Sequence, residues 1–358
     1  MGAAERSIIK RIYFILMLGF LASMTISYKA WFALTDFPTV SFWAFEVPFY
    51  VFQSLSGILA TLVFIQPFAF SSRLIPRAII LTMLLLFVLN QTLIQPWAWM
   101  YFLMIWLLSP FARYHYEYKE LAPLLRGFQV LMALIYIASG ALKIHPEFGS
   151  WTLPYILQPI TNFFWQFKEE LEGFFLFVPY FEIVFGASLL QPQIARFSRF
   201  GLIAMHLAIL GLLGPLGLNN NTVVWPWNIQ MILLLLVVFP HGYHKVEVFP
   251  IRFLIYKKPI NYVIGLVLIA AGLHFASIGN AYLAFDLYSG RTAYPQISLT
   301  KNELKRIPKS IDRYTYAEGD SIYINYFSWG YETLNIPPCP APWCNEVFEK
   351  KIIKRVTD

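Results

Sequence analysis

Eight or nine apolar segments, separated by short loops, dominate this chain of 358 residues. A helix needs about 20 apolar residues to cross the hydrocarbon core of a bilayer, with a range of about 17 to 25. The segments lie near 11–34, 48–70, 77–95, 97–112, 127–145, 174–191, 199–218, 227–240 and 260–279, and those at 97–112 and 227–240 are short. We therefore expect an all-α polytopic membrane bundle of about nine transmembrane helices, with the lipid bilayer as its solvent.

Lysine and arginine residues are concentrated in alternate loops between these segments. With a cytoplasmic N-terminus, the loops on the cytoplasmic side carry Arg73 and Arg77; Arg113, Lys119 and Arg126; Arg196 and Arg199; and Lys245, Arg252, Lys257 and Lys258. The opposite loops carry almost none, apart from Lys168. Because basic residues favour the cytoplasmic side, this pattern predicts a cytoplasmic N-terminus. An odd number of crossings then makes the C-terminus extracytoplasmic, whereas a re-entrant short segment would return it to the cytoplasm.

The formal net charge of +7 does not indicate a nucleic-acid partner. The basic residues lie between apolar segments and form no single basic face, so we interpret them as topology signals beside anionic lipid. Only 13% of the residues are charged. An ionisable residue inside an apolar segment is costly and is therefore a candidate for function.

Two regions differ from the bundle. The loop 151–173 mixes aromatic residues with Lys168 and three glutamates, which predicts an amphipathic piece on the outer surface. Residues 1–279 form the expected transmembrane domain, and 280–358 form a small soluble C-terminal appendage of α/β type. Within the appendage, Ser321–Phe327 suits a strand and Asn345–Val356 suits an amphipathic helix.

Cys339 and Cys344 are the only cysteines and lie in the sequence PPCPAPWC. In an oxidising compartment they are expected to form a disulfide. A redox-active pair usually has the spacing C-x-x-C, so this spacing favours a structural bridge. We expect the bridge to shape an exposed PPCPAPW surface that could dock a partner.

Lys143 and Glu182 are the leading candidates for chemistry. Each lies in the outer half of a predicted helix, and the two helices are sequential and antiparallel, so a contact between them would pair two intramembrane charges. Alternatively, Lys143 could extend to the interface. In an apolar pocket a neutral lysine amine is available as a base, with Glu182 as its partner.

Three histidines complete the candidate site: His145 follows Lys143 closely, His206 is placed in mid-membrane, and His274 lies further outward. Each of the last two could instead be a hydrogen-bonding residue between helices. No set of residues has metal-ligand spacing, and His241 and His244 suit an interfacial turn. No metal site is predicted.

The segments ALIYIASGALKIHPEFGSW, FFLFVPYFEIVFGASLLQPQIARFSRFGLIAMHLAIL and NTVVWPWNIQM, within residues 120–240, resemble the DoxX-like membrane proteins and the HTTM domain of vitamin K-dependent γ-carboxylase. By position, the resemblance implies that Lys143 is the base that deprotonates a reduced quinone, with an isoprenoid quinone as the cofactor. It also implies a bacterial inner membrane as the location.

Two classes of function follow. The first is a quinone-linked oxidoreductase or carboxylase-like membrane enzyme, with Lys143 as the base and Glu182, His206 and His274 lining the pocket. The second is a non-catalytic accessory subunit that docks onto other subunits of a membrane complex through its C-terminal tail. A pocket at these ionisable side chains would favour the enzyme.

Overall fold

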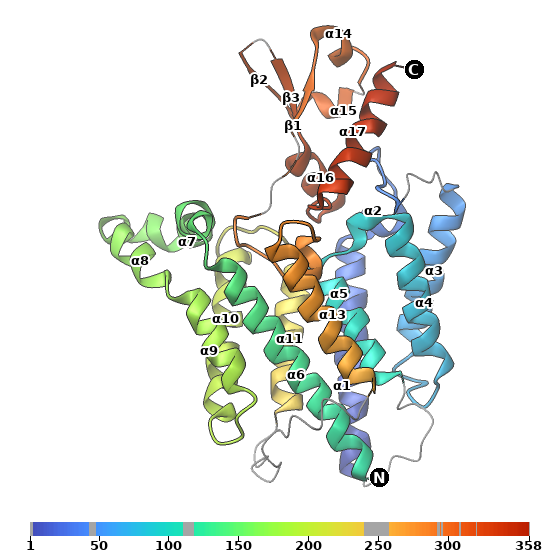
Figure 1. Cartoon of the computed structure of the whole chain (residues 1–358), viewed down its shortest axis with the longest axis vertical. Helices are drawn as coiled ribbons and strands as arrows, with labels where there is room; N and C mark the ends of the chain where they lie inside the picture. The colour runs from blue at the N-terminus through green and yellow to red at the C-terminus, as the bar shows by residue number, and fades with distance from the viewer. Residues whose placement is uncertain are drawn as a thin grey trace.

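The computed structural model describes residues 3–42, 48–109, 118–239, 258–291, 294, 296–307, 309–319 and 321–357. Helices make up most of it, and the C-terminal domain with its small sheet lies at the opposite end of the helical bundle from the N-terminus (Figure 1). The helices of the bundle are α1 (Ala3–Ile26), α3 (Phe49–Ile65), α4 (Leu74–Leu89), α5 (Pro96–Leu108), α6 (Tyr118–Lys143), α9 (Val178–Ser188), α10 (Ala195–Leu213), α11 (Val224–Val238) and α13 (Lys258–Phe275). Each expected apolar segment overlaps one of them, although α1 and α6 begin well before the expected starts at 11 and 127.

Helix length supports fewer complete crossings than the sequence predicts. Within the described residues, α1, α6 and α10 are long and apolar enough to cross a membrane, and the pair Trp165–Phe175 and Val178–Ser188, bent by 41°, passes the same test when taken together. The other five apolar helices have 10–17 residues. Nine complete crossings therefore remain a prediction.

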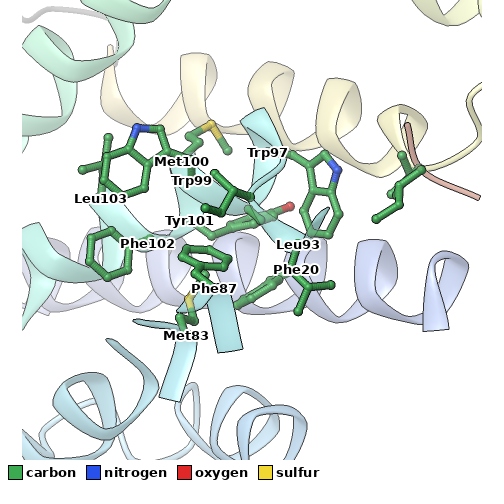
Figure 2. Packing of buried hydrophobic residues seen from close by; sticks show 14 of the residues in the cluster. Phe20, Met83, Phe87, Leu93, Trp97, Trp99, Met100, Tyr101, Phe102 and Leu103 are labelled. Atoms are coloured by element: carbon green, nitrogen blue, oxygen red, sulfur yellow. The ribbon is translucent and has the colours of Figure 1, made fainter. Parts of the chain in front are cut away.

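The short helix α5 forms the centre of the bundle and not a peripheral turn. Twelve of its thirteen residues are buried. Because the helix is surrounded by protein on all sides, its sequence is a continuous apolar run without a polar face. Its aromatic side chains pack against α1, where Tyr101 stacks on Phe20 with ring centroids 4.7 Å apart (Figure 2). Trp97 also packs against Trp31 of α2 (Tyr28–Phe32). Their ring centroids are 6.0 Å apart.

The outer faces of the bundle are apolar and exposed. Large apolar side chains point outward from several helices, among them Leu18, Phe64, Leu81, Phe197, Leu207, Leu268 and Ile269. An exposed apolar surface of this extent is unfavourable in water and marks contact with a membrane or a protein partner. The fold is thus compatible with a membrane protein.

Basic residues mark the end of the bundle that holds the N-terminus. The Lys10 ammonium lies 4.7 Å from the centre of the Phe70 ring, in the turn between α3 and α4, and Arg199 donates to the carbonyl oxygen of Phe239. These contacts bring the start of α1, the α3–α4 turn, the start of α10 and the end of α11 to one end. Arg113, His241, His244, Lys245, Arg252 and Lys257 lie outside the described residues.

At the other end, the chain leaves α6 through short helical pieces. These are the π-helix η4 (Phe148–Thr152), α7 (Leu153–Phe163), η5 (Trp165–Phe167) and α8 (Lys168–Phe175). Figure 1 shows α7 and α8 extending to one side of the bundle. In α7 the buried residues are Leu153, Leu157 and Thr161, four residues apart, as in an amphipathic helix. The predicted amphipathic character is confirmed for α7, whereas η5 and α8 have no buried residue, and a place on a membrane surface remains a prediction.

The C-terminal domain contains one antiparallel sheet of order β1-β3-β2. Its elements are η7 (Ala281–Ala284), β1 (Gln296–Leu299), α14 (Lys301–Leu304), α15 (Lys309–Asp312), β2 (Thr315–Glu318), β3 (Ser321–Asn325), α16 (Tyr326–Leu334) and α17 (Pro342–Thr357). The predicted strand 321–327 ends early, at Asn325, because the side chain of Asn325 accepts a hydrogen bond from the Ser328 amide and caps α16. The predicted C-terminal helix is present as α17 and begins at Pro342.

The segment around the cysteines packs against the bundle. Cys339 and Cys344 form a disulfide, and both residues have 0% exposure. The hydrogen bonds that attach this part of the chain run from Gln95 Nε2 to the Pro337 carbonyl (2.8 Å), from Trp343 Nε1 to Gln91 Oε1 (2.6 Å) and from Asn335 Nδ2 to the Ile26 carbonyl (3.1 Å). The expectation of an exposed PPCPAPW surface is wrong, because Cys339, Ala341 and Cys344 are fully buried.

Candidate functional site

One face of α6 carries three polar residues in the C-terminal part of the helix. Tyr136, Ser139 and Lys143 follow at spacings of three and four, which places them in a row on a helix. From Tyr136 to Lys143 the row extends about 10 Å, at about 1.5 Å per residue. The other residues of the candidate site contact this row.

Two glycines bring α9 against this face. A Cβ atom at Gly140 would lie 2.6 Å from the Pro179 carbonyl oxygen, and one at Gly186 would lie 2.7 Å from the Tyr136 Cβ. Both distances are shorter than any van der Waals contact, so the two backbones approach as closely as they do because these side chains are absent. Close helix crossings at small residues are common in membrane proteins.

The predicted contact between Lys143 and Glu182 is present at this crossing. Lys143 Nζ lies 3.0 Å from Oε1 and 2.8 Å from Oε2 of Glu182, and 2.6 Å from Ser139 Oγ. An ammonium group has three hydrogens to donate, and all three have an acceptor here. The side chains are only 10% and 6% exposed, so the pair is buried and hydrogen-bonded.

His206 of α10 belongs to a second polar network. Its Nε2 lies 2.7 Å from Tyr136 Oη and its Nδ1 lies 2.7 Å from Asn228 Oδ1. The Asn228 amide nitrogen donates to the Val224 carbonyl, which directs the Asn228 oxygen at the histidine. Nδ1 therefore donates to Asn228, and in a neutral imidazole Nε2 accepts from the Tyr136 hydroxyl. Tyr136 joins this network to the face of Lys143.

The remaining two histidines have other partners. His145 pairs with Glu147, and the side chains of both are partly exposed. His274 Nε2 lies 2.6 Å from Asp286 Oδ2, and Asp286 is 2% exposed. The three histidines thus take part in three separate interactions and are not joined to one another by hydrogen bonds.

A cavity of about 380 Å³ lies where the bundle meets the C-terminal domain. Its wall includes Asp286, the partner of His274. Lys143, Glu182 and His206 are not among the residues that line it. Lys143, Glu182 and His206 thus lie in a buried polar layer on α6, α9 and α10, His274 lies beside the cavity through Asp286, and His145 belongs to neither.

Sequence reasoning missed four participants: Tyr136, Ser139, Asn228 and Asp286. The first two could have been found, because they precede Lys143 by seven and four residues on the same helix face. Asn228 in WPWNIQM carries no charge, and Asp286 lies in the segment that the sequence predicts to be a soluble tail. Within the described residues, no group of three or more His, Cys, Asp or Glu side chains could hold a metal ion.

Comparison with known proteins adds no relative: no family model, no curated protein and no solved structure matches this chain.

Proposed function

We propose that this chain is a nine-crossing integral membrane protein of the HTTM/DoxX-like type, in which Lys143 acts as a base on a lipid-soluble substrate with an acidic hydroxyl, such as an isoprenoid quinol. The observation that carries the proposal is the row of Tyr136, Ser139 and Lys143, which faces Glu182 and His206 inside an apolar bundle. Ionisable residues at such depth are costly and commonly mark a functional site.

The proton chemistry begins with the pair itself. A proton moves from Lys143 Nζ to Glu182 Oε2 across the 2.8 Å contact, which leaves a neutral amine beside a carboxylic acid. The amine then takes the hydroxyl proton of the substrate: the O–H bond breaks, an N–H bond forms, and the substrate oxyanion faces the new ammonium. The pair now holds one extra proton, and its release to water restores the ion pair.

Binding of a quinol tests this proposal. The probes are ubiquinol-1 and ubiquinone-1, added to the purified protein in lipid nanodiscs. We expect Lys143→Met/Glu182→Leu to lower quinol affinity at least about tenfold, the equivalent of 1.4 kcal/mol. The matched control is Lys168→Met/Glu172→Leu, which removes the more exposed pair on α8, and it should bind like the unmodified protein.

The accessory subunit is a second candidate, favoured by a specific observation. Every donor of the Lys143 ammonium is already satisfied by Glu182 and Ser139, as expected of an ion pair that only holds α6 and α9 together. Docking would then use the exposed part of the C-terminal domain, since the cysteine segment is buried. Undetectable quinol binding, or equal binding by the double variant, would reject the base and favour this function.

We propose the bacterial inner membrane as the location, with the N-terminus cytoplasmic and the C-terminus outside. Support comes from the basic residues at the N-terminal end of the bundle and from the C-terminal domain at the opposite end (Figure 1). The nine apolar helices would then alternate in direction. The shorter apolar helices, of 13 to 17 residues, measure about 20–26 Å, so the bilayer must thin around them.

Single introduced cysteines test this topology in the full-length chain, because the two native cysteines are disulfide-bonded and buried. Arg196→Cys and Lys309→Cys replace exposed residues. With a membrane-impermeant maleimide, we expect Lys309→Cys to react in intact spheroplasts and Arg196→Cys to react only after permeabilisation. Equal reactivity of both positions in intact spheroplasts would mean that one of the nine segments does not cross.

A further inference from the structure

The cavity of about 380 Å³ is built from four parts of the chain. Residues of the consecutive helices η4 and α7, of the end of α10 and the turn after it, of the run 282–290 and of the later part of the C-terminal domain line it. Trp151 of η4 and Tyr155 of α7 are 76% and 45% exposed. Because tryptophan and tyrosine favour the membrane–water interface, this side of the cavity opens where lipid headgroups would lie.

Asp286 is the acidic residue of the cavity wall. Its Oδ2 atom is bonded to His274, whereas its buried Oδ1 atom has no hydrogen-bond partner among the described residues. A buried carboxylate oxygen without a donor is costly, and such atoms in native structures call for an explanation. A ligand that brings a positively charged N–H donor would supply the missing bond.

Asn221 offers a second acceptor in the same wall. Its amide nitrogen donates to Tyr288 Oη, which directs its Oδ1 atom away from that tyrosine and leaves Oδ1 without a partner among the described residues. Asn221 is 7% exposed. Two unpartnered acceptor oxygens, one of them anionic, thus belong to residues that line one cavity.

Tyrosine side chains provide much of the remaining wall. Tyr282 and Tyr294 are hydrogen-bonded to each other with 2.8 Å between their hydroxyl oxygens. Burial raises the pKa of Tyr288 and Tyr294 above that of an ordinary phenol, so these side chains stay uncharged. A wall of neutral aromatic rings with a single carboxylate favours a cation, because ring faces attract positive charge.

A basic residue lies next to the cavity. Arg291 follows the lining residue Gly290, and its guanidinium lies 5.5 Å from the centre of the Phe275 ring at the end of α13. Phe275 is 48% exposed, on the apolar surface of the bundle. Among the described residues, no carboxylate forms an ion pair with Arg291. Its charge is therefore available for an anionic group at the bilayer surface.

We infer that this cavity binds the headgroup of a zwitterionic lipid with a primary ammonium, of the ethanolamine class. The ammonium donates to Asp286 and Asn221 within the tyrosine wall, after rotation of these two side chains turns their buried Oδ1 atoms toward the cavity, and the lipid phosphate lies by Arg291. A lipid is the favoured source of the amine because the exposed rim is formed by interfacial aromatic residues and because an acidic and a basic group match the two charges of one headgroup. The site does not depend on the role of Lys143.

The test is lipid retention by the full-length protein. Protein is reconstituted in vesicles of equal parts phosphatidylethanolamine, phosphatidylcholine and phosphatidylglycerol, re-extracted in mild detergent, and its bound lipid is quantified by mass spectrometry. We expect phosphatidylethanolamine to be enriched at least about tenfold over phosphatidylcholine, which has the same charge but no N–H donor. Asp286→Asn should abolish the enrichment, while Glu332→Gln, at an exposed carboxylate of α16, should keep it.

A second variant covers the case in which Asp286→Asn does not fold. Leu287→Trp adds bulk to the cavity wall without changing a charged residue, and its control Leu216→Trp adds the same bulk at a residue that is 94% exposed. We expect only Leu287→Trp to lose the lipid. Equal retention of the three lipids, preference for phosphatidylglycerol, or enrichment that survives both cavity variants would overturn the inference. Protection from unfolding by free ethanolamine, without lipid enrichment, would keep the ammonium site but overturn a lipid as its source.

Discussion

Glu182→Leu is expected to destabilise the protein by about 3–5 kcal/mol, the usual effect of removing one partner of a buried ion pair. The substitution would leave the Lys143 ammonium with only Ser139 as an acceptor, in a place where its side chain is 10% exposed. The charge could not reach water without opening the crossing of α6 and α9. Denaturant unfolding of the detergent-purified protein, followed by tryptophan fluorescence, measures the change.

The double variant Lys143→Met/Glu182→Leu distinguishes two causes of the destabilisation: an unpaired buried charge on Lys143, or the loss of the contact itself. Replacing both members by apolar residues of similar size is often neutral or stabilising, so the double variant should recover most of the lost stability. Glu172→Leu is the control, since Glu172 pairs with Lys168 on α8, where the lysine is 57% exposed. A double variant as unstable as Glu182→Leu would show that the pair contributes net stability of its own.

Gly186→Leu is expected to have the second largest effect, a loss of about 3 kcal/mol, at the upper end of the range for overpacking. The first atom of the new side chain, its Cβ, would lie 2.7 Å from Tyr136 Cβ and 3.2 Å from the Ala133 carbonyl oxygen. Neither neighbour is the flexible end of a long side chain, so α6 and α9 must separate. Separation would also lengthen the contact between Lys143 and Glu182.

The control for this substitution is Gly211→Leu, in α10. A Cβ atom at Gly211 would meet nothing within 4 Å, and the residue is exposed, so the free energy of unfolding should change little. The same unfolding measurement applies to both variants. An equally stable Gly186→Leu protein would mean that α6 and α9 do not need the close approach at this glycine.

The helices were predictable because their signal is local. A long apolar run favours a helix, because a helix satisfies its backbone hydrogen bonds within one segment, and each expected segment overlaps one. The contact between Lys143 and Glu182 was predictable for a similar reason. Each charge is costly to bury alone, and the nearest opposite charge lies on the next antiparallel apolar segment, so pairing the two lowers the cost of both. The boundaries were less predictable, since side-chain caps such as that of Asn325 set them.

The pairing of His206 with its uncharged partners came only from the tertiary structure. His206 bonds to Tyr136, seventy positions earlier in the chain, and to Asn228 on the next helix. Tyrosine and asparagine occur in many environments, so nothing in the sequence marks these two as partners. Their roles follow from how α6, α10 and α11 are oriented, and packing sets that orientation.

The sequence by itself determined the apolar helices and the buried charge pair, since apolar length and the cost of charge act within one segment or between neighbouring apolar segments of the chain. Tertiary structure decided that the cysteine segment is buried and that Asp286 lines a cavity. Both depend on how the C-terminal domain docks onto the bundle, through contacts such as that of Gln95 with Pro337, 242 positions apart. Contacts between segments so far apart produce no periodic pattern in the sequence, because the two surfaces become complementary only after each has folded.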